Sequence, residues 1–167
     1  MKLIILDVDG TLTDGSLFFD SNGNETKRFN VKDGFAIRQA LENGLEVVLI
    51  TGRKSDSVQI RAQELCLTHV YQGVDNKLEK AQELIDLLSF KWEECAVIGD
   101  DLNDMRLMLK AGFSACPKDA ANEIYQLSDF KSNYCGGRGA VREIIEHILK
   151  SAGLWNKTLA KYTGECL

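Results

Sequence analysis

The chain has 167 residues, of which 44% are hydrophobic and 27% charged, and its formal net charge is −5. This length suits a single domain with a sizeable core, and an acidic chain without a lysine or arginine block is not expected to bind nucleic acid. No apolar stretch reaches the length of a signal peptide or of a membrane span, so we expect a cytoplasmic protein that does not bind membranes.

The cysteines and histidines form no recognisable disulfide or metal pattern. The cysteines are odd in number, and they are Cys66, Cys95, Cys116, Cys135 and Cys166. We interpret them as reduced thiols of a cytosolic protein. Because His69 and His147 have no cysteine or histidine at ligand spacing, we do not expect a zinc site.

In chain order, short apolar runs alternate with segments of helical pattern. The runs that predict buried strands are residues 3–8, 45–51, 69–71, 95–99 and 113–116. The segments that predict helices are residues 33–42, 55–65, 77–88, 103–110, 120–127 and 140–151. Asp33 and Asn76 are expected to cap two of these helices. The alternation predicts an α/β fold, with a Rossmann-like parallel sheet and helices on both of its faces.

One insertion interrupts this alternation just after the first strand. A β-hairpin is predicted at about residues 16–31, with its turn at Asn22 and Gly23. No linker composition divides the chain, so we expect one domain over residues 1–152 and a C-terminal tail over residues 153–167.

Two aspartates, Asp7 and Asp9, directly follow the first strand, and Gly10 comes next. Ligand crevices form at the carboxyl ends of parallel strands. Two carboxylates this close repel one another unless a cation or a shared proton lies between them. A divalent metal would explain the pair, with one aspartate as nucleophile and the other as proton shuttle, although aspartate and glycine are also common in an ordinary turn.

Two further groups follow later strands. Thr51 and Gly52 end the second long strand, where a hydroxyl and free N–H groups suit a phosphate oxygen. Lys77 begins a helix, whose N-terminus adds positive potential to the lysine charge. Taken alone, Thr51 and Gly52 are better explained by an ordinary strand-to-helix turn. A lysine such as Lys77 is usually a solvated surface residue.

An acidic cluster of Asp100, Asp101 and Asp104 follows the strand at residues 95–99. Such oxygen ligands suit Mg²⁺. The helix dipole alone would account for Asp104, but it explains the two adjacent aspartates less well. Together the four groups predict acids for a metal, a hydroxyl and a cation at one edge of the sheet, as phosphoryl transfer requires.

These elements, in this order, resemble the motifs of the haloacid dehalogenase superfamily of phosphatases. The resemblance implies that Asp7 is the nucleophile and forms an aspartyl-phosphate. It implies that Asp9 is the general acid for the leaving group and then the base for water. Thr51, Gly52 and Lys77 are implied to bind the phosphate.

The same resemblance implies Mg²⁺ as the cofactor. Its ligands would be the side chain of Asp7, the backbone carbonyl of Asp9 and the side chain of Asp100. Asp101 and Asp104 are implied to be supporting acids.

The spacings leave no room for the cap domain that many members of the superfamily carry over the site. Residues 13–45 hold only the hairpin and one helix, and residues 51–77 hold one helix and a short strand. A bare site is open to water, which efficient catalysis avoids, so either the substrate is large or another subunit closes the site. The apolar Phe18 and Phe19 of the hairpin favour a second subunit, although they could also pack on their own chain.

Arg138 lies between glycines just before the helix at residues 140–151. Such a loop either presents the guanidinium to a substrate carboxylate or is a flexible connector. Residues 32–34, 51–54, 71–73 and 136–143 together resemble the family of 3-deoxy-D-manno-octulosonate 8-phosphate (KDO 8-P) phosphatases, over most of the chain up to about residue 150.

The second resemblance implies a cap-less homotetramer in which neighbouring subunits complete each site. It also implies hydrolysis of a small sugar-acid phosphate, KDO 8-P, to KDO and phosphate in lipopolysaccharide precursor synthesis. Arg53 and Arg138 would bind this substrate. A phosphatase for a nine-carbon 2-keto-3-deoxy sugar acid 9-phosphate stays an alternative, although Arg53 is more similar to the eight-carbon enzymes.

Two alternatives involve no phosphatase activity. One is a non-catalytic tetramerisation module, which the intact set of Asp7, Asp9, Lys77 and Asp100 weakens. The other is a receiver-like phospho-acceptor domain. The order of motifs argues against it, because a receiver has its acceptor aspartate after the third strand, where this chain has Gln72.

Overall fold

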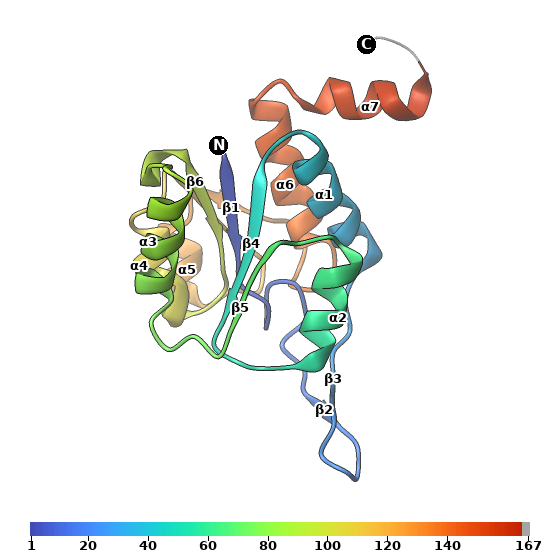
Figure 1. Ribbon diagram of the computed structural model, residues 1–167, viewed down its shortest axis with the longest axis vertical. Coiled ribbons are helices and arrows are strands. Elements are labelled where there is room, and N and C mark those ends of the chain that lie inside the picture. Colours follow the sequence, from blue (N-terminus) through green and yellow to red (C-terminus); the bar gives the residue numbers. More distant parts are fainter. Residues whose placement is uncertain (165–167) are drawn as a thin grey trace.

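The computed structural model describes residues 1–164, and its centre is a six-stranded sheet (Figure 1). The strand order is β5-β4-β1-β6-β7-β8, and every neighbouring pair is parallel. The strands are β1 (Leu3–Leu6), β4 (Glu46–Thr51), β5 (His69–Gln72), β6 (Cys95–Ile98), β7 (Phe113–Cys116) and β8 (Phe130–Lys131). The predicted α/β parallel sheet is confirmed. The sequence did not indicate β8, because two residues are too few to produce a strand pattern.

Helices cover both faces of the sheet (Figure 1). Those on one face are α1 (Val31–Glu42), α2 (Asp56–Glu64) and α6 (Ala140–Ser151). Those on the other face are α3 (Lys77–Leu87), α4 (Met105–Met108) and α5 (Asn122–Leu127). Within residues 1–164, no helix is both long and apolar enough to span a bilayer.

Strand β1 lies in the middle of the sheet and connects the two cores. Ile4 and Leu6 belong to the core under α1, α2 and α6, while Leu3 and Ile5 belong to the core under α3, α4 and α5. All four residues are at most 2% exposed, as expected for a central parallel strand with both faces covered. The residues that follow β1 are therefore held on a rigid support.

The N-terminus of α1 differs from the prediction. Asn30, not Asp33, is the N-cap, and its side chain accepts a hydrogen bond from the backbone N–H of Lys32. Asp33 lies inside the first turn, where it is 1% exposed. Its carboxylate accepts hydrogen bonds from the backbone N–H groups of Gly139 (3.3 Å) and Arg142 (2.7 Å). Asp33 therefore caps α6, a contact between segments far apart in the chain that the local sequence could not indicate.

The helix predicted at residues 103–110 is shorter and divided. A 3₁₀ turn, η2 (Leu102–Asp104), leads into α4. Asp101 caps the turn, because its side chain accepts a hydrogen bond of 2.7 Å from the N–H of Leu102. Asn76 caps α3 as predicted, by accepting from the N–H of Glu79.

The predicted hairpin is present and projects from the end of the body at which the sheet strands terminate (Figure 1). It consists of β2 (Phe18–Phe19) and β3 (Glu25–Thr26), which pair antiparallel. Asp20 holds the turn through hydrogen bonds from the N–H groups of Asn22 and Asn24. The backbone φ of +82° at Gly23 is one that glycine adopts without strain.

The C-terminal segment contains a helix that the sequence did not indicate. Helix α7 (Trp155–Thr163) packs against the ends of α1 and α6. Asn43 donates a hydrogen bond of 3.0 Å to Thr158, and Gln39 donates one of 3.1 Å to the hydroxyl of Tyr162. The four cysteines within residues 1–164 are free thiols, whereas Cys166 lies outside the described residues.

Candidate active site

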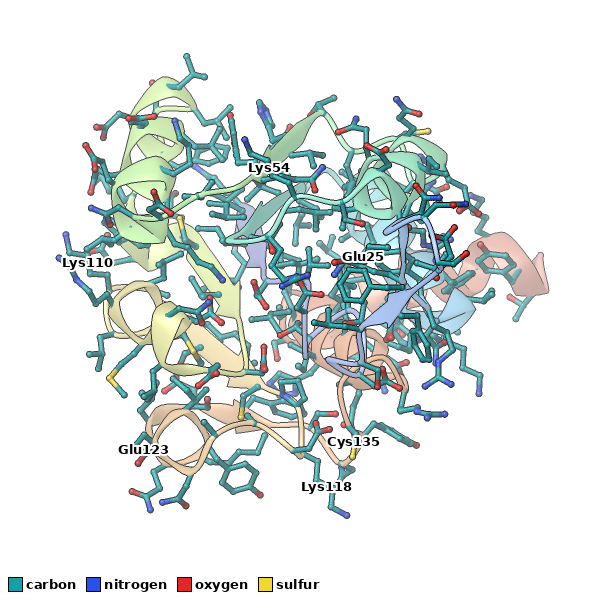
Figure 2. The ribbon with its side chains drawn as sticks, turned by 90° about the horizontal axis from the view of Figure 1, so that it is seen from below. Glu25, Lys54, Lys110, Lys118, Glu123 and Cys135 are labelled. Atoms are coloured by element: carbon teal, nitrogen blue, oxygen red, sulfur yellow. The ribbon has the colours of Figure 1, made fainter. Side chains whose placement is uncertain are left out.

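The site is built on the loop that leaves β1. The N–H of Asp7 donates to the carbonyl of Ile98 in β6 (3.0 Å), so the first acid is still held by the sheet. The carbonyl of Val8 then accepts from the N–H groups of Leu12 (2.9 Å) and Thr13 (3.0 Å), which closes a compact turn. Figure 2 looks onto this end of the molecule.

Gly10 is required in this turn for two reasons. Its φ is +91°, a left-handed conformation that side chains disfavour. A Cβ atom here would also lie 2.0 Å from Oδ2 of Asp100. The absence of a side chain thus allows the loop after β1 to approach the acidic loop after β6.

Lys77 connects the loop after β1 with the acidic loop after β6. Its Nζ donates to Oδ1 of Asp7 (2.6 Å) and to Oδ1 of Asp104 (2.7 Å). The Lys77 side chain is 4% exposed, so it is not a surface lysine. A buried ammonium is stable only when it is paired, and here it bridges elements that are widely separated in the sequence.

The acidic loop after β6 is tightly packed. The hydroxyl of Thr11 donates to Oδ1 of Asp100 (3.0 Å), and the N–H of Asp100 donates to Oδ2 of Asp104 (3.3 Å). A Cβ atom on Gly99 would lie 2.5 Å from the Asp104 carboxylate. Both carboxylates are therefore fixed, one by the loop after β1 and the other by its own loop and Lys77.

The pKa values of the buried acids are raised, first by burial and then by repulsion between the carboxylates. Burial and the nearby Asp104 carboxylate together raise the pKa of Asp7 to about 8, although Lys77 lowers it. Burial and Asp104 raise the pKa of Asp100 to about 6, against the hydrogen bond from Thr11. Burial lowers the pKa of Lys77, but the two carboxylates that it contacts outweigh burial and raise it. One lysine does not compensate for this group of acids.

These residues fit a divalent cation. Asp7, Asp100 and Asp104 each offer a carboxylate oxygen within 4.8 Å of the others. When ionised, three carboxylates and the single Lys77 ammonium leave two negative charges uncompensated. A hard cation with oxygen ligands is the chemistry that this donor set favours.

Asp9 lies in a second ionic network, which involves the hairpin. Its Oδ1 pairs with Nζ of Lys27, which also lies 2.9 Å from Oε1 of Glu25. Glu25 is paired in turn with Arg53, whose Nε is 4.0 Å from Oδ2 of Asp9. Figure 2 shows Glu25 near the middle of this end of the molecule. Sequence reasoning missed Lys27 and Glu25, because charges on a short hairpin are ordinarily solvated.

The remaining predicted residues lie around these two networks. Thr51 is 2% exposed at the end of β4, next to β1 in the sheet, and Gly52 follows it. The side chain of Arg138 is 58% exposed and its guanidinium lies 3.6 Å from Asp14. Asp101 is exposed and caps η2, so it does not join the three clustered carboxylates.

The glycine-rich loop at residues 136–139 supports the loop after β1. The N–H of Gly137 donates to the carbonyl of Thr11 (3.1 Å). A Cβ atom on Gly136 would lie 1.7 Å from the carbonyl oxygen of Gly10. Asp33 holds the other end of this loop through the N–H of Gly139. The loop thus contacts the turn after β1 directly, which its sequence alone did not indicate.

Comparison with known proteins gives consistent results. Residues 60–144 match the haloacid dehalogenase-like hydrolase family. The chain is 44% identical over 153 residues to the 3-deoxy-D-manno-octulosonate 8-phosphate phosphatase KdsC of Escherichia coli (strain K12), which covers 92% of this chain and 81% of that protein. It is 43% identical over 153 residues to the protein of that name from Salmonella typhi, with the same coverage of both chains.

Solved structures of similar proteins share the fold. The 3-deoxy-D-manno-octulosonate 8-phosphate phosphatase of Moraxella catarrhalis, solved with magnesium, phosphate and KDO, superposes with a TM-score of 0.94 at 38% identity, covering 97% of this chain and 93% of that one. The phosphatase from Yersinia pestis gives a TM-score of 0.90 at 38% identity, covering 92% and 83%. The chain therefore belongs to the haloacid dehalogenase-like hydrolases and, within them, to the family of the 3-deoxy-D-manno-octulosonate 8-phosphate phosphatases.

Proposed function

We propose that this protein is a Mg²⁺-dependent phosphatase that converts KDO 8-P to KDO and phosphate through an aspartyl-phosphate. The observation that carries this proposal is the buried bridge from Lys77 to Asp7 and Asp104. It holds a carboxylate nucleophile beside a cation, in a pocket of acids that suits a metal.

In the first step, a carboxylate oxygen of Asp7 attacks phosphorus. A bond forms between Asp7 and phosphorus, the bond from phosphorus to the sugar oxygen breaks, and the leaving oxygen takes a proton from Asp9. At about 4 Å and an effective dielectric constant near 20, each pair of like charges costs about 4 kcal/mol. Lys77 reduces this repulsion, and Thr51 and Gly52 provide a hydroxyl and an N–H at the end of β4 for the phosphate oxygens.

In the second step, water attacks the phosphorus of the aspartyl-phosphate. Asp9 takes a proton from this water, the bond between Asp7 and phosphorus breaks, and inorganic phosphate leaves. Both carboxylates thereby return to their starting states.

The side chains of Asp7 and Asp100 and the backbone carbonyl of Asp9 would hold Mg²⁺. When bound, the ion supplies positive charge where the nucleophile meets the phosphate. Asp104 contributes by holding Lys77, and Asp101 by capping η2.

The substrate assignment rests on the relatives and on two arginines. The relatives named above carry KDO 8-P phosphatase in their names, and the Moraxella structure contains KDO. Arg53 and Arg138 lie at the margin of the site and would bind the substrate carboxylate. The product would enter lipopolysaccharide precursor synthesis, and a nine-carbon 2-keto-3-deoxy sugar acid 9-phosphate is the second candidate substrate.

Phosphate release from the eight-carbon and nine-carbon esters, with and without Mg²⁺, tests this function. We expect kcat/KM to be at least about tenfold higher for the eight-carbon ester, because a shaped site discriminates by about that factor for a small change in the substrate. Activity should fall to background in EDTA and return with Mg²⁺.

The variant R138A serves as a second arm of this test. It should raise KM for both sugar acids without changing KM for p-nitrophenyl phosphate, which has no carboxylate. If the nine-carbon ester is preferred, it is the substrate in place of KDO 8-P. If no ester is hydrolysed, the result favours the non-catalytic tetramerisation module.

We further propose a homotetramer in which neighbouring subunits complete each site. Leu17, Phe18 and Phe19 of the hairpin are 45%, 50% and 59% exposed. The hairpin lies at the end of the molecule that carries the site (Figure 1). Adjacent apolar side chains of this size favour burial against another protein surface. Between β4 and Lys77 the chain forms only α2 and β5, so no cap of its own covers the site.

The double variant F18S/F19S tests the assembly by light scattering coupled to size exclusion. The wild type should have about four times the mass of one chain, whereas the variant should be smaller, because each serine removes roughly 1.5–3 kcal/mol of apolar burial per subunit. The matched control is L87S, because Leu87 is 72% exposed at the end of α3, a helix that lies away from the hairpin (Figure 1). A monomeric wild type would contradict the proposal.

The proposed location is the cytoplasm, and the proposed organisation is one catalytic domain over residues 1–152 with a C-terminal segment at 153–167. The free thiols of Cys66, Cys95, Cys116 and Cys135 support the location, because reducing compartments maintain thiols. No contact with nucleic acid or membrane is part of this function.

A further inference from the structure

We propose that Lys27 is the positioning residue for Asp9, and that it fixes which oxygen of that carboxylate exchanges the proton with the leaving group. This inference rests on the proposed function. It goes beyond it by giving the hairpin a role within its own subunit, in addition to any role in assembly.

The first observation is the burial of Lys27. Its side chain is 1% exposed, although it directly follows the two-residue strand β3 on a projecting hairpin. Lysine is rarely buried in this way unless it is paired. Within the part of the chain that the structure describes, its ionic partners are Asp9 and Glu25.

The second observation is the difference between the two oxygens of Asp9. Oδ1 accepts from Nζ of Lys27. Oδ2 is buried and, among residues 1–164, has no hydrogen-bond partner. A buried acceptor without a partner costs free energy. A hydrogen bond between Oδ2 and a group of the bound substrate would remove this cost. Nε of Arg53 lies 4.0 Å from Oδ2, beyond hydrogen-bond distance, so the ion pair with Lys27 leaves Oδ2 as the oxygen that meets the leaving group.

The third observation is that the base of the hairpin is anchored. The hydroxyl of Ser57 in α2 donates to the backbone carbonyl of Glu25 (3.3 Å), and Arg53 pairs with the Glu25 carboxylate. Glu25 in turn holds Lys27 at 2.9 Å. The ammonium is therefore held from the β4–α2 side of the site, and a fixed donor is what restricts a general acid to one orientation.

The variant K27M tests this role, because methionine keeps the buried apolar stem and removes the ammonium. The comparison uses kcat/KM for two substrates. An alkyl ester such as the sugar phosphate requires proton transfer from Asp9 as the leaving group departs, whereas p-nitrophenyl phosphate has a leaving group that departs without a proton. We expect K27M to lower kcat/KM at least tenfold more for the alkyl ester than for the aryl ester.

A double-mutant cycle separates positioning from a general structural effect. In a D9N background, K27M should cause no further loss with the alkyl ester, since its effect passes through Asp9. The losses of melting temperature in K27M and D9N should likewise be non-additive. The variant K27R should restore most of the alkyl-ester activity that K27M loses.

The matched control is R28M. Arg28 is the next residue of the hairpin, but it is half exposed and pairs with Asp14. Its loss should leave the ratio of the two kcat/KM values unchanged.

The outcomes separate this inference from the proposed function. If the wild type hydrolyses both esters and K27M lowers both values equally, or lowers neither, the positioning role is overturned while the phosphatase stands. Additive losses in the cycle would overturn it in the same way. If the wild type hydrolyses neither ester, the proposed function is overturned and this inference with it.

Discussion

Replacing Asp7 with asparagine is expected to abolish phosphate release, with kcat reduced by at least about 10³-fold. The asparagine side chain is nearly isosteric and can still accept the hydrogen bond from Lys77, but it is not a nucleophile toward phosphorus. Steady-state phosphate release with Mg²⁺ measures the loss. Rapid quench with labelled substrate should show phosphate bound covalently to the wild type and none bound to D7N.

The D7N variant should lose its activity without losing stability. Burial raises the pKa of Asp7 to about 8 from the ordinary value of 3.8. A carboxyl whose pKa is raised in the folded state binds more protons folded than unfolded, so its contribution to stability falls as the pH rises from about 4 to about 8. At pH 7 without Mg²⁺, the free energy of unfolding of D7N should therefore be equal to or higher than that of the wild type.

The matched control for D7N is D75N. Asp75 is an exposed acid two residues before Lys77, so this substitution makes the same chemical change outside the network. Its activity should be unchanged. Near wild-type turnover by D7N would show that another group attacks phosphorus.

The parts of the structure that the sequence predicted are those in which local pattern and burial coincide. The apolar run that forms β1 gave both the position of the central strand and the place of Asp7 and Asp9. The sequence identifies Asn76 as a cap because capping involves residues three apart. The positions of Lys77 and Asp104 after strands predict that they share the site, and the structure brings them together at 2.7 Å.

The parts that the sequence did not predict depend on contacts between distant segments. Asp33 looks like a local cap, yet it caps α6 more than a hundred residues later in the chain. Lys27 looks like a solvated hairpin charge until Asp9 lies beside it. Helix α7 was not predicted, because its packing on α1 depends on hydrogen bonds from Gln39 and Asn43. Propensity and periodicity describe neighbours in sequence, so they carry no information on these contacts.

The second large effect is expected for G136A. Gly136 has no unusual φ, so alanine adds no backbone strain here. The effect comes from space alone, because the new Cβ would lie 1.7 Å from the carbonyl oxygen of Gly10 and 2.8 Å from that of Thr13. Backbone atoms cannot move aside as a flexible side chain can, so the loop after β1 must shift. Overpacking of this kind costs about 1–3 kcal/mol of stability.

The activity of G136A should fall even where the variant is fully folded, so the loss of stability alone does not account for it. Gly10 directly follows Asp9, and a Cβ atom on it would lie 2.0 Å from Oδ2 of Asp100, so a shift of the Gly10 carbonyl displaces the proposed general acid and a proposed metal ligand together. A displacement of about 1 Å in a catalytic group costs on the order of 10²-fold, and we expect kcat/KM to fall by at least that factor at a temperature where the variant is fully folded.

G44A is the control that separates the two causes in G136A. Gly44 has a φ of +83° and open space around it, so alanine there adds backbone strain without a clash. It should lose about 1–2 kcal/mol of stability and keep its activity, whereas G136A loses activity because the carbonyl that it displaces belongs to the turn that carries Asp9. Equal kcat/KM values for G136A and the wild type would mean that the loop after β1 tolerates this shift, and that the glycine-rich loop does not determine the geometry of Asp9.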